Sequence, residues 1–169
     1  MYEKIFISVG ANLKRDKNLS LVQNCLYGLN QLHNYGIHLK SISKWYKTEP
    51  IPVSDQPWFA NAVINVSTSM EPKETLLKLH EIEKSFGRKR KLKNEPRTLD
   101  LDIIDFEGFV KKSDPILPHP RMHLRHFVLL PLFQLEPNWE HPVFKENISS
   151  LIDKNLNKED QNILLINES

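Results

Sequence analysis

The sequence has a single cysteine, Cys25, and only five glycines among its 169 residues. One cysteine excludes an internal disulfide framework and is typical of proteins kept in a reducing cytosol, so we expect a cytoplasmic location. The glycines form neither a G-x-G-x-x-G nor a G-x-x-x-x-G-K pattern. If this protein binds a nucleotide, side-chain cations and metal ions must therefore hold the phosphates in place of a glycine-rich loop.

Long hydrophobic runs and a strong charge of one sign are missing as well. The longest late apolar run, FVLLPLF, has seven residues with a proline inside it, and the N-terminus MYEKIFISVG does not resemble a signal peptide. We therefore expect no membrane association. The net charge of +2 gives no reason to expect a polyanionic partner. The length favours one domain over residues 1–169, with a sizeable core.

The order of the periodic segments predicts the fold. The pattern is strand, helix, strand, strand, helix, strand, which is the order of a ferredoxin-like α/β sandwich of the α+β class, a mainly antiparallel sheet with helices packed on it. The strands are expected at residues 4–9, 38–46, 59–69 and in the DLDI stretch from 100, and the helices at 20–32 and 72–86. A further helix after residue 116, a short helix at 148–154 and an edge strand in NILLI are expected in the remainder.

The stretch EPRTLDLDIIDF, residues 95–106, places two carboxylates on a hydrophobic strand. Alternation puts Asp100 and Asp102 on the same face, with Cα atoms about 6.6 Å apart. Like charges so close are unfavourable unless water or a cation separates them. Mg²⁺ binds one or two carboxylates and completes its shell with water and substrate phosphates, so a magnesium site is one interpretation. An ordinary solvated strand is the other.

The segment before this strand, RKRKLKNEPR at 88–97, is strongly basic. Arg88, Arg90 and Arg97 carry planar guanidinium groups that match phosphate oxygens and do not lose their charge. A solvated basic loop would be the simpler interpretation if the segment stood alone. Next to paired carboxylates, it indicates a site for phosphate and metal together, with the loop closing over an anionic substrate.

Three histidines in HPRMHLRH, His119, His123 and His126, have spacings typical of a zinc site on a helix. Two prolines interrupt the helix that such a site requires, and no cysteine or acid nearby completes the ligand set. We expect instead that His119 and Arg125 contact an anionic ligand, and that the other two histidines are partly exposed.

Asn61 is an unusual residue in an otherwise apolar strand. It lies two residues after Phe59 and therefore on the same face. A buried amide needs a hydrogen-bond partner. A flat heterocycle that stacks on Phe59 and bonds to Asn61 would meet both needs, although Trp58, Phe59 and Phe127 also suit an ordinary core.

Several motifs in one order resemble a known family. PRTLDLDI after GRKRK, then LPHPRMHLRHFVLLPL, with SKWYKTEP and DQPWFANAV upstream, are similar to 6-hydroxymethyl-7,8-dihydropterin pyrophosphokinase, from about Ile5 to Pro137. The resemblance implies a ferredoxin-like enzyme of folate biosynthesis with three mobile loops. It would transfer pyrophosphate from ATP to the pterin hydroxymethyl oxygen and release AMP. The implied partners are ATP and the pterin, with no nucleic acid and no membrane, and the implied state is a monomer.

The resemblance also implies a role for each matched residue. Asp100 and Asp102 would bind two Mg²⁺ ions that bridge the ATP phosphates, and with Arg88 and Arg90 they would form the catalytic set. The implied ATP site comprises Glu83, Arg88, Arg90, Arg97, His119 and Arg125. The implied pterin pocket comprises Thr48, Phe59, Asn61, Asn94 and Phe127.

Two features depart from the family pattern. Asn94 stands where many members carry a Trp that covers the pterin, and the loop over 87–96 is one residue shorter than in some members. Both bear on how the lid closes, whereas the metal site is unaffected. Phe59 stands where some relatives have Tyr, which keeps the stacking surface and loses a hydroxyl.

Three rival functions remain open at this point. An RNA-binding module of this topology needs aromatic residues in an RNP-type pattern, and GRKRKLKNEP supplies none. A metal-dependent phosphohydrolase would release phosphate or pyrophosphate without a pterin. An inactive descendant of the family would give no turnover. The reaction products distinguish all of these from a pyrophosphokinase.

Overall fold

The computed structural model describes residues 1–88, 94–155 and 162–167. It shows a six-stranded antiparallel sheet in the order β5-β1-β4-β3-β6, with β2 also paired to β4. The strands are β1 (Tyr2–Ala11), β2 (Ile37–Ile42), β3 (Tyr46–Thr48), β4 (Phe59–Thr68), β5 (Asp100–Phe106) and β6 (Ile163–Leu165). The helices are α1 (Leu21–Leu29), α2 (Pro72–Ser85), α3 (His126–Leu135) and α4 (Ile148–Asn155), with 3₁₀ turns η1 (Leu32–Tyr35) and η2 (Met122–Leu124).

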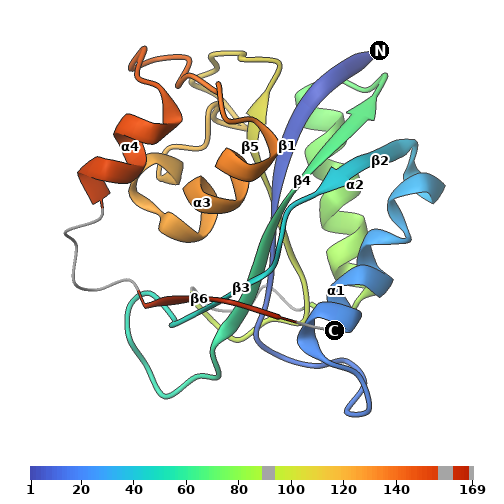
Figure 1. Cartoon of the computed structure of the whole chain (residues 1–169). Helices are drawn as coiled ribbons and strands as arrows, with labels where there is room; N and C mark the ends of the chain where they lie inside the picture. The colour runs from blue at the N-terminus through green and yellow to red at the C-terminus, as the bar shows by residue number, and fades with distance from the viewer. Residues whose placement is uncertain (89–93, 156–161, 168–169) are drawn as a thin grey trace.

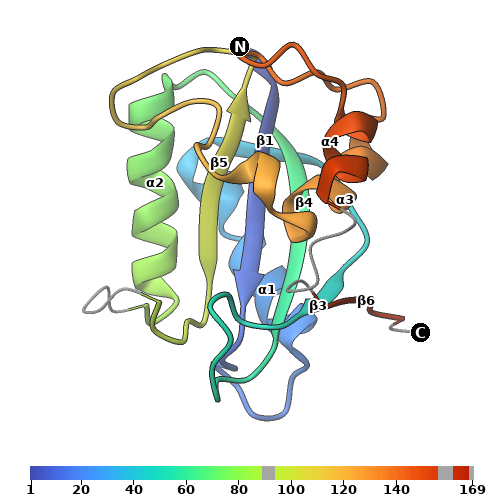
Figure 2. The same cartoon turned by 90° about the vertical axis from the view of Figure 1, so that its left-hand side faces the viewer.

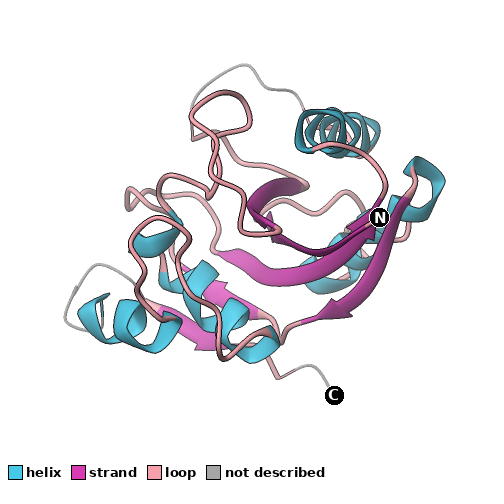
Figure 3. Cartoon of the chain, turned by 90° about the horizontal axis from the view of Figure 1, so that it is seen from above, coloured by secondary structure: helices cyan, strands magenta, loops and turns pink. Residues whose placement is uncertain are grey.

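The predicted fold, a mainly antiparallel sheet with helices packed on it, is confirmed, and the helices cover both faces of the sheet. Helices α1 and α2 lie on one face and α3 and α4 on the other (Figures 1, 2 and 3). Each face has its own core: Ile7 and Leu101 lie in the first, and Phe6 and Ile104 in the second. Successive residues of β1 and β5 thus alternate between these two cores, although β5 lies at the edge of the sheet and pairs only with β1. Among the described residues, no helix is long and apolar enough to cross a lipid bilayer.

The expected strand over residues 38–46 is wrong in one respect, because it divides into β2 and β3. The division comes at Ser43, whose hydroxyl accepts a hydrogen bond from the Val63 amide (2.9 Å) and donates one to the Lys44 carbonyl (2.8 Å). The next amide, that of Lys44, donates to the Gln134 side chain (3.0 Å). Side chains thus replace part of the backbone ladder at this point, although the Ser43 amide still donates to the Val63 carbonyl (2.9 Å). The hydropathy pattern does not reveal such a substitution.

The helix expected over residues 20–32 is also shorter than predicted. It begins after Ser20, which caps it in a capping box with Gln23, and it ends at Leu29. The Gln31 amide then donates to the Gly28 carbonyl (3.0 Å), an i to i−3 bond that tightens the chain toward η1. The other predicted helices are confirmed, and so is the edge strand in NILLI, where β6 pairs with β3.

A β-bulge in β5 turns Asp105 toward the α3–α4 face. Phe6 is paired with Asp105 and Ile7 with Ile103, so Ile104 is the extra residue. The Asp105 carboxylate accepts hydrogen bonds from the Trp139 indole (2.9 Å) and the Gly108 amide (3.1 Å). Burial raises the pKa of Asp105, although both hydrogen bonds act in the opposite direction.

This burial predicts a pH-dependent gain of stability in Asp105→Asn. Because the folded pKa of Asp105 is raised, the unfolded chain releases this proton first, and stability declines as pH rises through the folded pKa. The amide cannot ionise and keeps an acceptor oxygen. We therefore expect the free energy of unfolding of the variant, relative to that of the wild type, to be higher at about pH 7 than at about pH 3.5. The lower value lies below the ordinary Asp pKa of about 3.9. Denaturant unfolding at both pH values measures this, and an equal difference at both would contradict it.

Candidate active site

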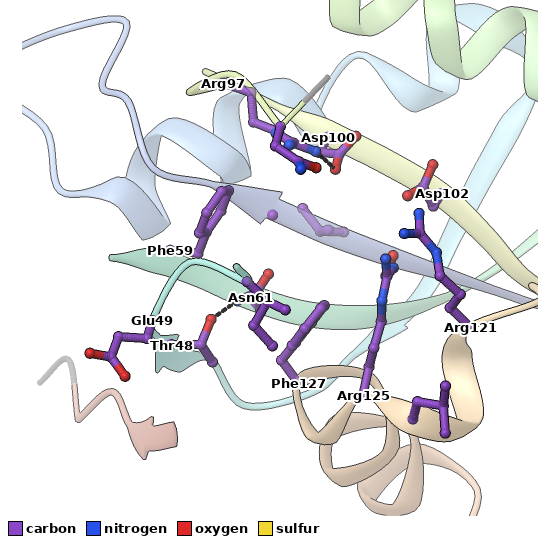
Figure 4. A pocket seen from close by; sticks show the side chains of 16 residues that line it. Thr48, Glu49, Phe59, Asn61, Arg97, Asp100, Asp102, Arg121, Arg125 and Phe127 are labelled. Atoms are coloured by element: carbon purple, nitrogen blue, oxygen red, sulfur yellow. Dashed lines mark hydrogen bonds and ion pairs between the residues drawn. The ribbon is translucent and has the colours of Figure 1, made fainter. Parts of the chain in front are cut away.

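A cavity of about 340 Å³ opens where β5, β1 and β4 meet the start of α3 (Figure 4). The sheet register builds its floor, because Gly10 of β1 pairs with Asn61 on one side and with Asp100 on the other. Two residues earlier on β1, Ser8 pairs with Asp102. Three neighbouring strands therefore bring the amide and the two carboxylates to one space; the alternation in the sequence predicts only that Asp100 and Asp102 share a face.

Asp100 is held by two arginines. Its carboxylate pairs with Arg88 on one oxygen and with the Arg97 guanidinium on the other, at 2.6 Å. Burial alone would raise the pKa of Asp100, but the charges of Arg88 and then Arg97 outweigh it and hold the pKa below the ordinary value. Asp100 therefore stays ionised, as a metal ligand or phosphate partner must.

Glu83 on α2 binds Arg88, one of these two arginines. Its Oε1 accepts hydrogen bonds from the Arg88 guanidinium (2.7 Å) and from the Leu101 amide (2.8 Å), and the residue is only 1% exposed. Glu83 and Arg88 are not among the residues that line the cavity. The structure thus places both behind Asp100, where they orient it, and their predicted contact with ATP stays a prediction.

The two aspartates suit a magnesium ion. Asp100 and Asp102 both line the cavity, on one face of β5. In the described part of the chain, no cluster of three or more His, Cys, Asp or Glu side chains forms a complete metal cage. Two carboxylates beside an open cavity fit Mg²⁺, which takes few protein ligands and leaves positions for water and phosphate oxygens. They do not fit a structural zinc site.

The other end of the cavity is polar and aromatic. The Asn61 amide donates to the Thr48 hydroxyl at 2.6 Å, which supplies the partner that the sequence required. Gly10 lies beside it, and a Cβ there would lie 2.8 Å from Asn61 Oδ1 and displace this amide. Phe59 from β4 and Phe127 from α3 line the same space (Figure 4). This geometry offers hydrogen bonds and ring surfaces to a flat ligand.

Amide side chains connect the loops around the cavity by hydrogen bonds, and no sequence pattern predicts these contacts. Asn12, which is 3% exposed, donates to the Gln56 side chain (3.1 Å) and accepts from the Arg97 amide (2.8 Å). Gln56 donates in turn to the Asn94 carbonyl (2.8 Å). Asn94 has a positive φ of 60° and lines the cavity. The predicted pterin residue Asn94 and the predicted ATP residue Arg97 are therefore held by one network.

The predicted anion contacts lie on the third side. Arg125 lines the cavity with its guanidinium over the Phe127 ring, and His119 lies close by on the segment that leads to η2. Burial, then the charges of Arg125 and Arg121, lower the pKa of His119 to about 4. His119 is therefore neutral at pH 7, and any cationic contact on this side comes from arginine.

The predictions for the other two histidines of this segment differ in outcome. His126 is buried and bonds to the Asn155 carbonyl (2.7 Å), so the expected partial exposure is wrong for it. His123 is partly exposed as expected, and its ring packs edge-on against Phe144. The three histidines thus have different surroundings. Arg90 lies outside the described residues.

Sequence comparison identifies the protein family of this chain. Residues 6–137 match the family model of 7,8-dihydro-6-hydroxymethylpterin-pyrophosphokinase, HPPK. The chain belongs to this family. The expectation drawn from the motifs is confirmed, and the matched region contains the whole cavity described above.

Curated relatives agree with this assignment. The 2-amino-4-hydroxy-6-hydroxymethyldihydropteridine pyrophosphokinase of Haemophilus influenzae is 35% identical, over 77% of this chain and 79% of the relative. The Aquifex aeolicus protein of the same name is 28% identical, over 89% of this chain and 91% of that protein. The folic acid synthesis protein fol1 of Pneumocystis carinii is 35% identical over 90% of this chain. The chain spans only about a fifth of that longer relative.

Solved structures share the fold. A crystal structure of HPPK-DHPS in complex with substrates matches 91% of this chain and 43% of its own, with a TM-score of 0.67 and 14% identity. Plasmodium falciparum HPPK-DHPS A437G with SDX-DHP matches 95% of this chain and 46% of its own, with a TM-score of 0.64 and 14% identity. At this identity the likeness concerns the fold alone.

Proposed function

We propose that this HPPK family member transfers pyrophosphate from ATP to 6-hydroxymethyl-7,8-dihydropterin and releases AMP, with Mg²⁺. The observation that carries the proposal is a single cavity with two chemically different ends. Asp100, Asp102 and Arg125 lie at one end, and Asn61 and Phe59 at the other. A phosphate donor and a flat acceptor can therefore meet in one space, which pyrophosphoryl transfer requires.

The phosphate end supplies positioning and charge. Mg²⁺ on Asp100 and Asp102, two ions as the family resemblance implies, would neutralise phosphate charge and orient its oxygens. Arg97 and Arg125 would bind phosphate oxygens through their guanidinium groups. Phosphoryl transfer needs little covalent help from the protein, so the fixed geometry of β5 is the main contribution of the chain.

The pterin end supplies recognition. Asn61 can turn an amide group to the polar edge of the ring, while Thr48 holds that amide in place. Phe59 and Phe127 offer ring faces on either side of the polar group, and Asn94 lines the same end. Arg97 lies over the Phe59 ring at 5.5 Å, so a stacked pterin would lie next to the phosphate-binding cations.

The test is the product analysis. Purified protein is incubated with ATP, Mg²⁺ and 6-hydroxymethyl-7,8-dihydropterin, and each component is omitted in turn. Equal amounts of AMP and pterin pyrophosphate, formed only when all three are present, support the proposal. ADP, inorganic phosphate, or pyrophosphate formed without pterin would indicate a phosphohydrolase, and no turnover would indicate an inactive descendant.

Asn61→Ala tests the pterin end alone. The variant loses the amide that faces the cavity and leaves Thr48 without its 2.6 Å partner. We expect pterin to bind about tenfold or more weakly, because one hydrogen bond to a buried polar ligand is lost. ATP affinity should change less than twofold. Titration calorimetry with each ligand measures both, with exposed Asn138→Ala as the control. An equal loss of both affinities would contradict a separate pterin end.

We also propose that residues 1–169 act as one domain and as a monomer. Both hydrophobic cores use the same sheet, which supports one cooperative unit. Light scattering coupled to size-exclusion chromatography measures the mass in solution.

A further inference from the structure

Arg121 is a charged residue of the cavity to which neither the sequence motifs nor the family resemblance gave a role. It lines the cavity at the start of η2, and its guanidinium end faces Asp102 (Figure 4). The side chain is exposed at the rim, and its position is set by the backbone on which it stands.

Anchors on both sides fix that backbone. The His119 amide donates to the Ile104 carbonyl of β5 (2.8 Å), and the next anchor, Met122, is fully buried in the α3–α4 core. The Arg121 amide itself donates to the His119 imidazole (3.1 Å). Arg121 therefore stands on a short turn held to the strand that carries Asp102, and its reach over the cavity is built into the fold.

The ion pairs seen around the cavity are formed by arginines other than Arg121. Within the described residues, these ion pairs join Arg88 and Arg97 to Asp100, and none involves Arg121. Arg121 and Asp102 nevertheless point into the same space from two sides (Figure 4). A cation and a carboxylate that line the same cavity suit a ligand that carries both signs, such as a phosphate with its metal ion.

The position of Arg121 favours contact with a phosphate group over contact with the pterin. Asn61, Thr48 and Phe59 lie across the cavity from it (Figure 4). Its neighbours are Asp102 and Arg125, and the neighbouring His119 is neutral. The guanidinium fork matches two phosphate oxygens, which a neutral imidazole does not.

We propose that Arg121 binds the phosphate chain of the nucleotide beside Asp102, as a further arginine contact next to Arg125. This inference rests on the proposed function, since it names another residue of the same phosphate site. A purely structural role would make Arg121 a surface residue that only steadies η2.

The experiment compares Arg121→Ala and Arg121→Lys with the wild type. Binding of MgATP, magnesium tripolyphosphate and the pterin is measured by titration calorimetry, and the melting temperature is recorded. We expect Arg121→Ala to weaken MgATP and tripolyphosphate binding about tenfold or more, because a bidentate charged contact is lost. Pterin affinity and the melting temperature should stay unchanged. Arg121→Lys keeps the charge without the fork and should lie between the two.

The control is Lys112→Ala, which removes an exposed cation from the preceding loop and should change none of these values. Unchanged tripolyphosphate binding in Arg121→Ala would overturn the inference. A lower melting temperature with equal loss of all ligands would also overturn it and show a structural role. The wild-type product assay is separate: if it yields no AMP while tripolyphosphate binding still depends on Arg121, the proposed function fails and the phosphate contact stands.

Discussion

Asp102→Asn is expected to reduce turnover by about 100-fold or more, because an ionised ligand for metal and phosphate charge is replaced by a neutral amide. The substitution is nearly isosteric, and Asp102 lines the cavity on β5 opposite Ser8 of β1, so the fold should be retained. The expected loss is in kcat at saturating ATP and pterin. Mg²⁺ should also bind more weakly, as a titration of the protein with the metal and nucleotide together measures.

The control for this variant is Asp114→Asn, which removes an exposed carboxylate outside the cavity. Turnover of this control should equal that of the wild type. If Asp102→Asn retains most of its turnover at saturating Mg²⁺, the proposed metal role of Asp102 is wrong. If turnover falls while the affinity for Mg²⁺ is unchanged, the carboxylate acts on the substrate in another way.

The sequence predicted which side chains share a strand face. Alternation in β5 places Asp100 and Asp102 on one face, and the same rule places Phe59 and Asn61 together on β4. The sequence also predicted a hydrogen-bond partner for Asn61, because burying an amide in an apolar strand without one is costly. These inferences use only neighbours one or two residues apart, which the sequence displays directly.

Contacts between distant segments were not predictable in this way. Asn12, Gln56 and Arg97 meet only after three loops have been brought together by the sheet, and each alone resembles an ordinary polar loop residue. Arg121 likewise has a role only once η2 is held against β5. The division between β2 and β3 depends on one serine hydroxyl, and local hydropathy has no information about it.

Glu83 is another residue whose surroundings could not be predicted from the sequence. Its substitution is expected to cause the second large effect, a loss of stability. The residue has a helical spacing that could have placed it on a solvated face, yet it is buried between α2 and β5. Its carboxylate joins Arg88 to the Leu101 amide, so it links the basic segment to the strand that carries both aspartates. Removing it leaves a buried amide without its acceptor and a guanidinium with one fewer partner.

Glu83→Ala is therefore expected to lower the free energy of unfolding by about 3–5 kcal/mol, the usual cost of breaking a buried ion pair from one side. Glu83→Gln should cost less, because its amide oxygen can still accept from the Leu101 amide at 2.8 Å. Glu81→Ala on the same helix is the matched control. Its carboxylate is half exposed and pairs with Lys78, so about 0.5 kcal/mol or less should be lost. Denaturant unfolding measures all three variants, and a Glu83→Ala value no larger than that of Glu81→Ala would show that the buried link does not hold β5 in place.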